Sequence, residues 1–239
     1  MDKPKKSLSQ NFIIDKNICK KIINQTNVKN KTIVEIGPGY GFMTDNILDR
    51  NPKRIILIEK DNNLINFLKN KYKTNDKVSV VGADVLNIDL KQYNKISIIS
   101  NLPYNISTKI ILYLFEFRNN IDEMILMIQK EVAQKFDYNL NNMNKYKFLT
   151  KIVSDFNRCF DVSPKVFFPK PKIISTVVKF KFINQNVDFQ KAKFFSKQIF
   201  KNIRKKINNN LKKKINNDLA NKRVNQLSIK DLLIIYNFF

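Results

Sequence analysis

Residues 32–41, Thr-Ile-Val-Glu-Ile-Gly-Pro-Gly-Tyr-Gly, decide the fold. The β-branched run Thr32–Ile36 predicts a buried strand, and the glycines at positions 37, 39 and 41 predict a tight turn that leads into a helix. The whole chain has four glycines, and three of them lie within these last five residues. Because glycine is so rare elsewhere, the cluster indicates positions that cannot accept a side chain, where the backbone approaches a ligand closely.

The turn differs from the dinucleotide-binding fingerprint. Its spacing is G-x-G-x-G instead of G-x-G-x-x-G. Pro38 also lacks the backbone N–H that a pyrophosphate would use. We therefore expect a nucleoside ligand without phosphates, and a plain strand-to-helix turn is the alternative interpretation.

Two acidic residues follow the next two predicted strands. Glu59 ends the apolar run Arg54–Glu59, and Asp84 follows the run Val78–Val81. At the carboxyl edge of a parallel sheet, Glu59 would accept hydrogen bonds from ribose hydroxyls, and Asp84 would accept one from an exocyclic adenine amine. Either acid alone is typical of a solvated strand end, but the glycine turn and both acids together predict an adenosine site.

The tetrapeptide Asn101-Leu102-Pro103-Tyr104 follows a fourth predicted strand, Ile96–Ser100, and precedes a helix predicted over Ile106–Phe117. Open α/β sheets carry their chemistry at such strand ends. A polar turn is the alternative interpretation, because Asn and Pro favour turns. A fifth strand is expected over Met124–Ile128.

The remainder of the chain predicts a sheet edge and a second domain. We expect an exposed loop over Tyr138–Lys147, followed by two strands, Phe156–Phe168 and Ile173–Phe182, paired like a hairpin at the edge of the sheet. The segment Ala192–Phe239 has no Gly or Pro and repeats apolar residues at helical spacing. It therefore predicts a small helical domain.

Several classes of protein are excluded by what the sequence lacks. The chain has no histidine, which excludes serine–histidine hydrolases, zinc peptidases and histidine general bases. Cys19 and Cys159 are too far apart for a zinc motif or a disulfide framework, so we expect no metal site. No apolar run approaches the roughly 18 residues of a membrane span, and no apolar core follows Met1–Lys6 as in a signal peptide. We expect a soluble cytoplasmic protein, and an organellar one is the alternative.

Positive charge dominates the chain, with 44 Lys and Arg against 20 Asp and Glu and a formal net charge of +24. Codon drift in an AT-rich genome explains Lys in place of Arg, but not this excess of bases. A nucleic-acid partner is the first expectation. We place a first domain over residues 1–183 and a basic second domain over residues 184–239. Its expected RNA contacts are Arg204, Lys205, Lys206, Lys212, Lys213 and Lys214.

Seven motifs occur in an order and spacing that resemble the ribosomal RNA adenine N6-dimethyltransferases. The seven are Ser9-Gln10-Asn11-Phe12, Glu35-Ile36-Gly37-Pro38-Gly39, Glu59, Asp84, Asn101-Leu102-Pro103-Tyr104-Asn105-Ile106-Ser107-Thr108, Gln129-Lys130-Glu131-Val132-Ala133 and Phe168-Pro169-Lys170-Pro171-Lys172. The resemblance implies an α/β fold, a Rossmann-like class I methyltransferase sheet with a small all-helical C-terminal domain.

The resemblance also implies roles for the matched residues. S-adenosyl-L-methionine would be held by Asn11, Ile13, Gly37, Gly39, Glu59, Asp84 and Asn101. The catalytic residues would be Asn101, Leu102, Pro103 and Tyr104. Tyr104 and Phe167 would stack on the two faces of a flipped-out adenine.

These residue types suit methyl transfer to an adenine N6 amine, whose lone pair is delocalised into the ring. The Asn101 oxygen and the Leu102 or Pro103 carbonyl would accept its two protons, which aims a localised lone pair at the donor methyl. No strong base is needed, because the methylated nitrogen is acidic. The lack of histidine is therefore no obstacle.

One departure concerns RNA docking: the chain has Tyr146-Lys147-Phe148-Leu149-Thr150 where the family usually has Tyr-Gly-Arg-Leu-Ser, and its second domain is short. We expect a monomeric enzyme that dimethylates two adjacent adenines near the 3′ end of small-subunit ribosomal RNA, in immature subunits. One alternative is a large-subunit RNA methyltransferase that confers macrolide resistance. The other is a non-catalytic RNA-binding assembly or transcription factor on the same scaffold.

Overall fold

The structure is a computed structural model. It describes residues 11–183, 187–211 and 218–239. Its contacts divide the chain into two compact units. The first unit consists of Met1–Ala133 and Asn157–Phe182, and the second of Gln134–Phe156 and Ile183–Phe239. The second unit is thus built from two stretches of chain, whereas the sequence suggested one continuous stretch.

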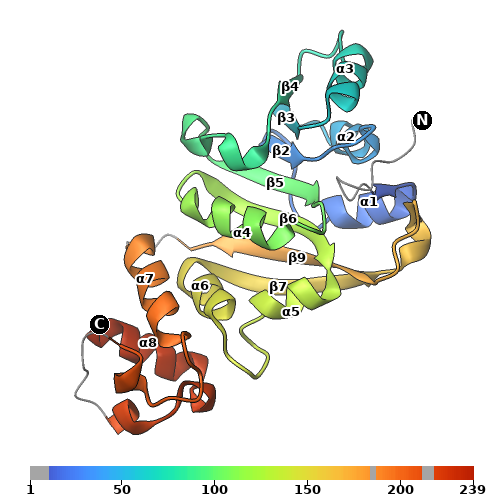
Figure 1. The fold of residues 1–239 in the computed structure, drawn as a ribbon. Helices are drawn as coiled ribbons and strands as arrows, with labels where there is room; N and C mark the ends of the chain where they lie inside the picture. The colour runs from blue at the N-terminus through green and yellow to red at the C-terminus, as the bar shows by residue number, and fades with distance from the viewer. Residues whose placement is uncertain (1–10, 184–186, 212–217) are drawn as a thin grey trace. The chain divides into compact units, whose positions relative to one another are not determined.

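A seven-stranded sheet with the order β4-β3-β2-β5-β6-β9-β7 runs through the structure (Figure 1). Its strands are β2 (Thr32–Ile36), β3 (Arg54–Glu59), β4 (Val78–Gly82), β5 (Ile96–Asn101), β6 (Ile121–Gln129), β7 (Ser154–Val162) and β9 (Ser175–Phe182). The first five run parallel, and β9 is antiparallel to β6. This arrangement confirms the predicted α/β class.

The strand order reverses at β2. From β2 the chain builds outward through β3 to β4, then returns to place β5 on the other side of β2. In open α/β sheets, such a reversal leaves a crevice at the carboxyl ends of the two central strands. Gly37 and Asn101 lie at these two ends.

Helices follow most of the parallel strands of the first unit. They are α2 (Phe42–Leu48), α3 (Asn62–Lys71), α4 (Ser107–Glu116) and α5 (Lys130–Phe136), which continues into the second unit, while α1 (Lys16–Ile23) precedes β2. Two of them begin at aspartates that cap free backbone N–H groups. Asp15 accepts hydrogen bonds from the N–H groups of Asn17 and Ile18, and Asp61 accepts one from Asn63.

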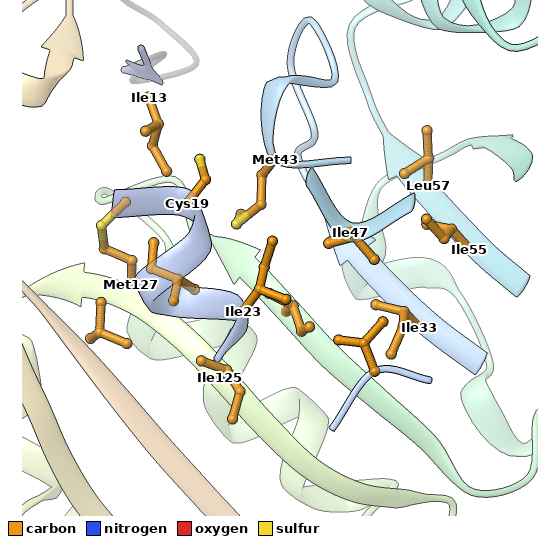
Figure 2. Packing of buried hydrophobic residues seen from close by; sticks show 14 of the residues in the cluster. Ile13, Cys19, Ile23, Ile33, Met43, Ile47, Ile55, Leu57, Ile125 and Met127 are labelled. Carbon is orange, nitrogen blue, oxygen red and sulfur yellow. The ribbon is translucent and has the colours of Figure 1, made fainter. Parts of the chain in front are cut away.

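One face of the sheet is buried under α1 and α2 (Figure 2). The sheet supplies Ile33, Ile55, Leu57, Ile125 and Met127 to this cluster, and the helices supply Cys19, Ile23, Met43 and Ile47. All five sheet positions are odd-numbered, because alternate residues of a strand point to opposite faces. On the opposite face, Phe115 of α4 packs edge-on against Phe180 of β9, with ring centroids 5.7 Å apart. Burial on both faces explains the continuous apolar runs of these strands.

The predicted strand Phe156–Phe168 is shorter than expected. It ends at Val162, because Pro164 begins a 3-10 turn that the preceding Ser163 caps. After this turn, β8 (Phe167–Phe168) leaves the main sheet and pairs with β1 (Phe12–Ile13) in a two-stranded ribbon.

The second unit contains α6 (Lys145–Val153), α7 (Phe189–Ile199) and α8 (Ile229–Phe238). Aromatic side chains join these helices. Phe148 of α6 lies 5.1 Å from Phe195 of α7 and 5.5 Å from Tyr236 of α8, measured between ring centroids. This part of the chain has the helical character that the sequence predicted.

The predicted exposed loop over Tyr138–Lys147 was wrong at its end. Asn144 caps α6, and Lys147 lies within the helix with its side chain buried. Its Nζ donates hydrogen bonds to the carbonyls of Leu140 and Asn141 at 2.9 and 2.6 Å. Burial lowers the pKa of Lys147. Lys147, which stands where the family usually has a glycine, thus links α6 to the preceding loop by hydrogen bonds.

Glu123 of β6 ties three segments of the first unit together. Its Oε1 accepts hydrogen bonds from Thr26 Oγ1 and from Lys31 Nζ, the latter at 2.9 Å. Its Oε2 lies 2.7 Å from Lys179 Nζ. Burial raises the pKa of Glu123, but the hydrogen bonds from these three residues outweigh burial and lower the pKa to about 2.

We expect Glu123→Gln to reduce the free energy of unfolding by about 3 kcal/mol at pH 7, since a folded pKa near 2 lies below the unfolded value of about 4.3. This stabilisation is complete above about pH 5 and is lost as the pH falls toward 2. Urea unfolding at pH 7 and pH 3 measures it. The difference between wild type and variant should shrink to about half at pH 3, and an unchanged difference would contradict the assignment.

Candidate active site

A cavity of about 690 Å³ lies at the carboxyl ends of the parallel strands. Its volume falls in the range of about 300–1,000 Å³ that is usual for small-molecule sites. Every residue predicted to bind the cofactor or to act in catalysis lines it: Asn11, Ile13, Gly37, Gly39, Glu59, Asp84, Asn101, Leu102, Pro103 and Tyr104. The structure thus brings these ten residues together, while their individual roles stay predictions.

The glycine turn forms one wall of the cavity. Gly37, Gly39 and Gly41 have φ values of 66°, 60° and 76°, a left-handed conformation that favours glycine. A Cβ added at Gly39 would lie 2.6 Å from a ring carbon of Phe12. A Cβ added at Gly37 would meet no atom of the described residues within 4 Å. Gly39 is therefore required by packing, and Gly37 borders open space.

Side chains of α2 and of the C-terminal end of α3 fix the position of the turn. Lys71 Nζ donates to the Tyr40 carbonyl at 3.0 Å, and the Tyr72 hydroxyl donates to the Gly41 carbonyl at 3.0 Å. Asp45 accepts from both side chains, at 2.6 Å from Lys71 and 2.7 Å from Tyr72. These bonds fix the turn in place before any ligand binds.

Glu35 is a buried acid at the end of β2, beside the turn. Its Oε2 accepts a hydrogen bond from Thr44 Oγ1 at 2.6 Å. Burial raises the pKa of Glu35 to about 8. The carboxyl is therefore mostly protonated at neutral pH, so it adds little negative charge to the cavity.

The two acidic residues that are predicted to bind the cofactor differ in burial and in their hydrogen-bond partners. Glu59 is buried, and its Oε1 accepts from the N–H groups of Lys60 and Asp61 at 2.8 and 2.9 Å. Burial raises the pKa of Glu59. Asp84 is more exposed: its Oδ2 pairs with Lys60 Nζ at 2.8 Å, and its Oδ1 accepts from the N–H of Leu86 at 3.0 Å. The Lys60 ammonium lowers the pKa of Asp84, which stays ionised.

Asn101 presents a hydrogen-bond acceptor without a protein partner. Its Nδ2 donates to the Asn11 carbonyl at 2.9 Å. A carbonyl can only accept, so this bond fixes which end of the amide carries the oxygen. Among the described residues, Oδ1 is buried and has no hydrogen-bond partner. A buried unpaired acceptor costs about 1–3 kcal/mol, and this one indicates a ligand donor.

The rest of the tetrapeptide is also fixed. The Tyr104 hydroxyl lies 2.6 Å from Ser175 Oγ, which sets the position of its ring on the cavity wall. Burial raises the pKa of Tyr104, so it stays a neutral phenol. The Pro103 carbonyl accepts from the N–H of Ile106 at 3.3 Å, within the turn that leads to α4. Of the two carbonyls considered as second acceptor, that of Leu102 is therefore the better candidate.

Phe167 is not where the stacking prediction needs it. It does not line the cavity, and it pairs with Ile13 across the β1–β8 ribbon. Both side chains are buried in the hydrophobic cluster, with 3% and 5% of their surface exposed. The reason is strand alternation, which turns Phe167 toward the core and its neighbour Phe168 away from it. A stacking role for Phe167 stays a prediction without support from its position.

The predicted RNA contacts are only partly described. Arg204, Lys205 and Lys206 are exposed in the second unit, and no acidic side chain pairs with them among the described residues. Lys212, Lys213 and Lys214 lie outside the described residues. Within residues 11–183, 187–211 and 218–239, no group of three acids or cysteines could hold a metal ion, and no helix is long and apolar enough to cross a membrane.

Sequence reasoning missed an aromatic wall of the cavity. Phe12 contacts Tyr40 edge-on at 5.0 Å, and Tyr40 contacts Phe67 at 5.2 Å, between ring centroids. All three line the cavity, and so does Lys60. Phe12 stands in a matched motif and could have been found there. Phe67 has the spacing of a core residue of α3, so nothing in the sequence distinguishes it.

A family model described as ribosomal RNA adenine dimethylase matches residues 1–238. Among the most similar curated proteins are two named ribosomal RNA small subunit methyltransferase A. The one from Malacoplasma penetrans is 39% identical over 181 residues, which cover 73% of this chain and 65% of that protein, less than two thirds of its length. The one from Pelagibacter ubique is 37% identical over 185 residues, which cover 74% of this chain and 70% of that protein.

Solved structures show the same fold. A dimethyladenosine transferase from Plasmodium falciparum has a TM-score of 0.80 at 22% identity and covers 95% of this chain and 100% of its own. The 23S rRNA methyltransferase ErmE has a TM-score of 0.77 at 18% identity and covers 95% and 98%. These likenesses confirm a class I methyltransferase sheet with a C-terminal helical part.

Proposed function

This chain belongs to the ribosomal RNA adenine dimethylase family, and we propose that it dimethylates the N6 amines of two adjacent adenines near the 3′ end of small-subunit ribosomal RNA. The family and the fold imply S-adenosyl-L-methionine as its cofactor. The observation that carries the proposal is the buried Oδ1 of Asn101 on the cavity wall, which has no hydrogen-bond partner in the part of the chain that the structure describes. An amine donor is the partner that this oxygen lacks.

The cavity suits the cofactor. Open space borders Gly37, where a side chain would intrude, and the backbone N–H groups after Glu59 fix a carboxylate that can accept from two ribose hydroxyls. Asp84 would accept from the adenine amine. When bound, the cofactor supplies an electrophilic methyl group on a sulfonium. The other residues named here position the nitrogen that receives it.

Asn101 and Leu102 would act on the substrate amine. The Oδ1 of Asn101 and the carbonyl of Leu102 would accept hydrogen bonds from its two N–H groups. These bonds favour a tetrahedral nitrogen whose lone pair is localised and aimed at the donor methyl. The bond from Asn101 Nδ2 to the Asn11 carbonyl holds the oxygen in place beforehand. Such prior orientation replaces a strong base. The ring of Tyr104, fixed by Ser175, would stack on one face of the base.

The choice of the small subunit rests on the names of the curated relatives, because ErmE, which is named a 23S rRNA methyltransferase, shares the fold. We further propose that the substrate is an immature subunit, that the enzyme acts as a monomer and that it works in the cytoplasm. The excess of positive charge supports an RNA partner.

The test is methyl incorporation from labelled cofactor into three substrates: immature small subunits, fully methylated small subunits and naked large-subunit RNA. We expect label only in the first, and mass spectrometry should place two methyl groups on each of two adjacent adenines. Label in large-subunit RNA alone would overturn the substrate assignment. RNA binding with no label in any substrate would instead support a non-catalytic factor.

A further inference from the structure

The β1–β8 ribbon carries two aromatic side chains on the face that the core does not cover. Phe12 pairs with Phe168, and Ile13 pairs with Phe167. Side chains directly opposite one another in an antiparallel pair lie on the same face, about 5 Å apart at Cβ. Since Ile13 and Phe167 face the core, Phe12 and Phe168 share the other face. Both residues of β1 line the cavity, and Phe168 is the direct cross-strand partner of Phe12, which places the exposed Phe168 beside a residue of the cavity wall.

Phe168 belongs to a group of exposed apolar side chains, here called the rim, that consists of Ile14, Phe168, Ile173 and Ile174. Phe168 is 54% exposed and Ile14 is 53% exposed. Ile14 also lines the cavity, and Ile174 directly precedes Ser175, which holds the Tyr104 hydroxyl. Two residues of the rim are therefore placed at the cavity: Ile14 lines it, and Phe168 is paired with Phe12, which also lines it. Exposed apolar side chains beside a cavity are typical of a binding surface.

The charges around the rim favour a polyanion. Lys165, Lys170 and Lys172 are exposed, and no acidic side chain pairs with them among the described residues. Residues 163–174 contain no Asp or Glu. An exposed aromatic ring between unpaired lysines is the arrangement with which proteins bind single-stranded nucleic acid, through base stacking and phosphate contacts.

We propose that Phe168 is the stacking platform for the nucleotide next to the target adenine, with the lysines around the rim on its phosphates. This inference rests on the proposed function. Because Phe168 lies beside the cavity wall and not among its lining residues, its ring meets the neighbour of the flipped base. Stacking tolerates any base, so the platform accepts either of two adjacent adenines while the other occupies the cavity.

The test uses a short RNA that contains the target adenines, with the fluorescent base 2-aminopurine placed either at the target position or at its neighbour. Stacking on an aromatic ring quenches this fluorescence. Phe168→Leu keeps an apolar side chain but removes the ring, and Phe168→Tyr keeps the ring. We expect Phe168→Leu to weaken RNA binding about 5- to 30-fold and to abolish quenching at the neighbour position only. Phe168→Tyr should behave like wild type.

Affinity for S-adenosylmethionine, measured by calorimetry, should be unchanged in both variants, because Phe168 does not line the cavity. A loss of quenching at the target position instead would place Phe168 on the flipped base and overturn the proposal. Unchanged RNA binding and unchanged quenching in Phe168→Leu would also overturn the proposal. If that variant nevertheless bound whole subunits more weakly, Phe168 would contact a protein of the subunit and not RNA. If the wild-type protein methylates immature small subunits, the proposed function stands under both of these outcomes and only the platform fails.

Discussion

Asn101→Ala should slow methyl transfer by about 100- to 1,000-fold, the usual loss when one preorganised hydrogen-bond partner of a transition state is removed. The alanine lacks the Oδ1 that is buried at the cavity wall and that no side chain or backbone group of the described residues bonds to. RNA affinity should stay within a few-fold of wild type, because most of it comes from phosphate contacts elsewhere. Single-turnover rates with saturating RNA and cofactor measure the effect, and an unchanged rate would remove the mechanism.

Asn46→Ala is a matched control for this experiment. Asn46 of α2 is also buried, its Nδ2 donates to the Phe42 carbonyl at 2.8 Å, and its Oδ1 also has no partner among the described residues. It does not line the cavity. Both variants lose one hydrogen bond from a buried amide, which costs about 1 kcal/mol. Similar melting temperatures with different transfer rates would separate chemistry from stability.

Asn101→Asp tests the orientation of the amide. The carboxylate has nearly the same shape but no N–H donor, so one of its oxygens would face the Asn11 carbonyl oxygen that Nδ2 now contacts. We expect the side chain to turn away and transfer to fall nearly as far as in Asn101→Ala. Activity close to wild type would show that the bond to Asn11 does not position the acceptor.

The convergence of the candidate site residues on one cavity could be predicted because a parallel sheet brings the ends of its strands together. Glu59, Asp84 and Asn101 are far apart in sequence, yet each directly follows a recognisable apolar run, so their convergence follows from the fold alone. The partner of the Asn101 amide could not be predicted, since Asn11 lies just before a two-residue strand, in a segment with no pattern of its own.

Phe167 and Phe168 show where the sequence is insufficient. Adjacent residues of a strand point to opposite faces, so a difference of one position decides which ring is buried. Two consecutive phenylalanines in a two-residue strand give no periodicity from which to choose. Pairing with Ile13 makes the choice, and that contact joins residues more than 150 positions apart. Lys147 was misjudged for a related reason, because its burial depends on carbonyls of the preceding loop that its ammonium contacts.

Gly39→Ala and Gly37→Ala should separate the two functions of the glycine turn. Both positions have φ near +60°, and alanine costs about 1–2 kcal/mol in that conformation. At Gly39 the new Cβ also lies 2.6 Å from the Phe12 ring, which must move and lose its contact with Tyr40. Such overpacking adds about 1–3 kcal/mol. Urea unfolding should therefore show a loss of about 2–5 kcal/mol for Gly39→Ala and only about 1–2 kcal/mol for Gly37→Ala.

Gly37→Ala, the variant with the smaller loss of stability, should nevertheless bind the cofactor poorly. The Cβ of Gly37→Ala meets no described atom within 4 Å and enters open space at a residue that lines the cavity. If the cofactor passes along this turn, the side-chain methyl group of the alanine occupies space that the cofactor needs. We then expect at least a tenfold loss of S-adenosylmethionine affinity by calorimetry and a smaller cofactor-induced rise in melting temperature, although the fold is nearly as stable as wild type. Wild-type affinity in Gly37→Ala would mean that the turn contacts no ligand at this position. The clustering of three of the four glycines in the turn would then need a purely structural cause.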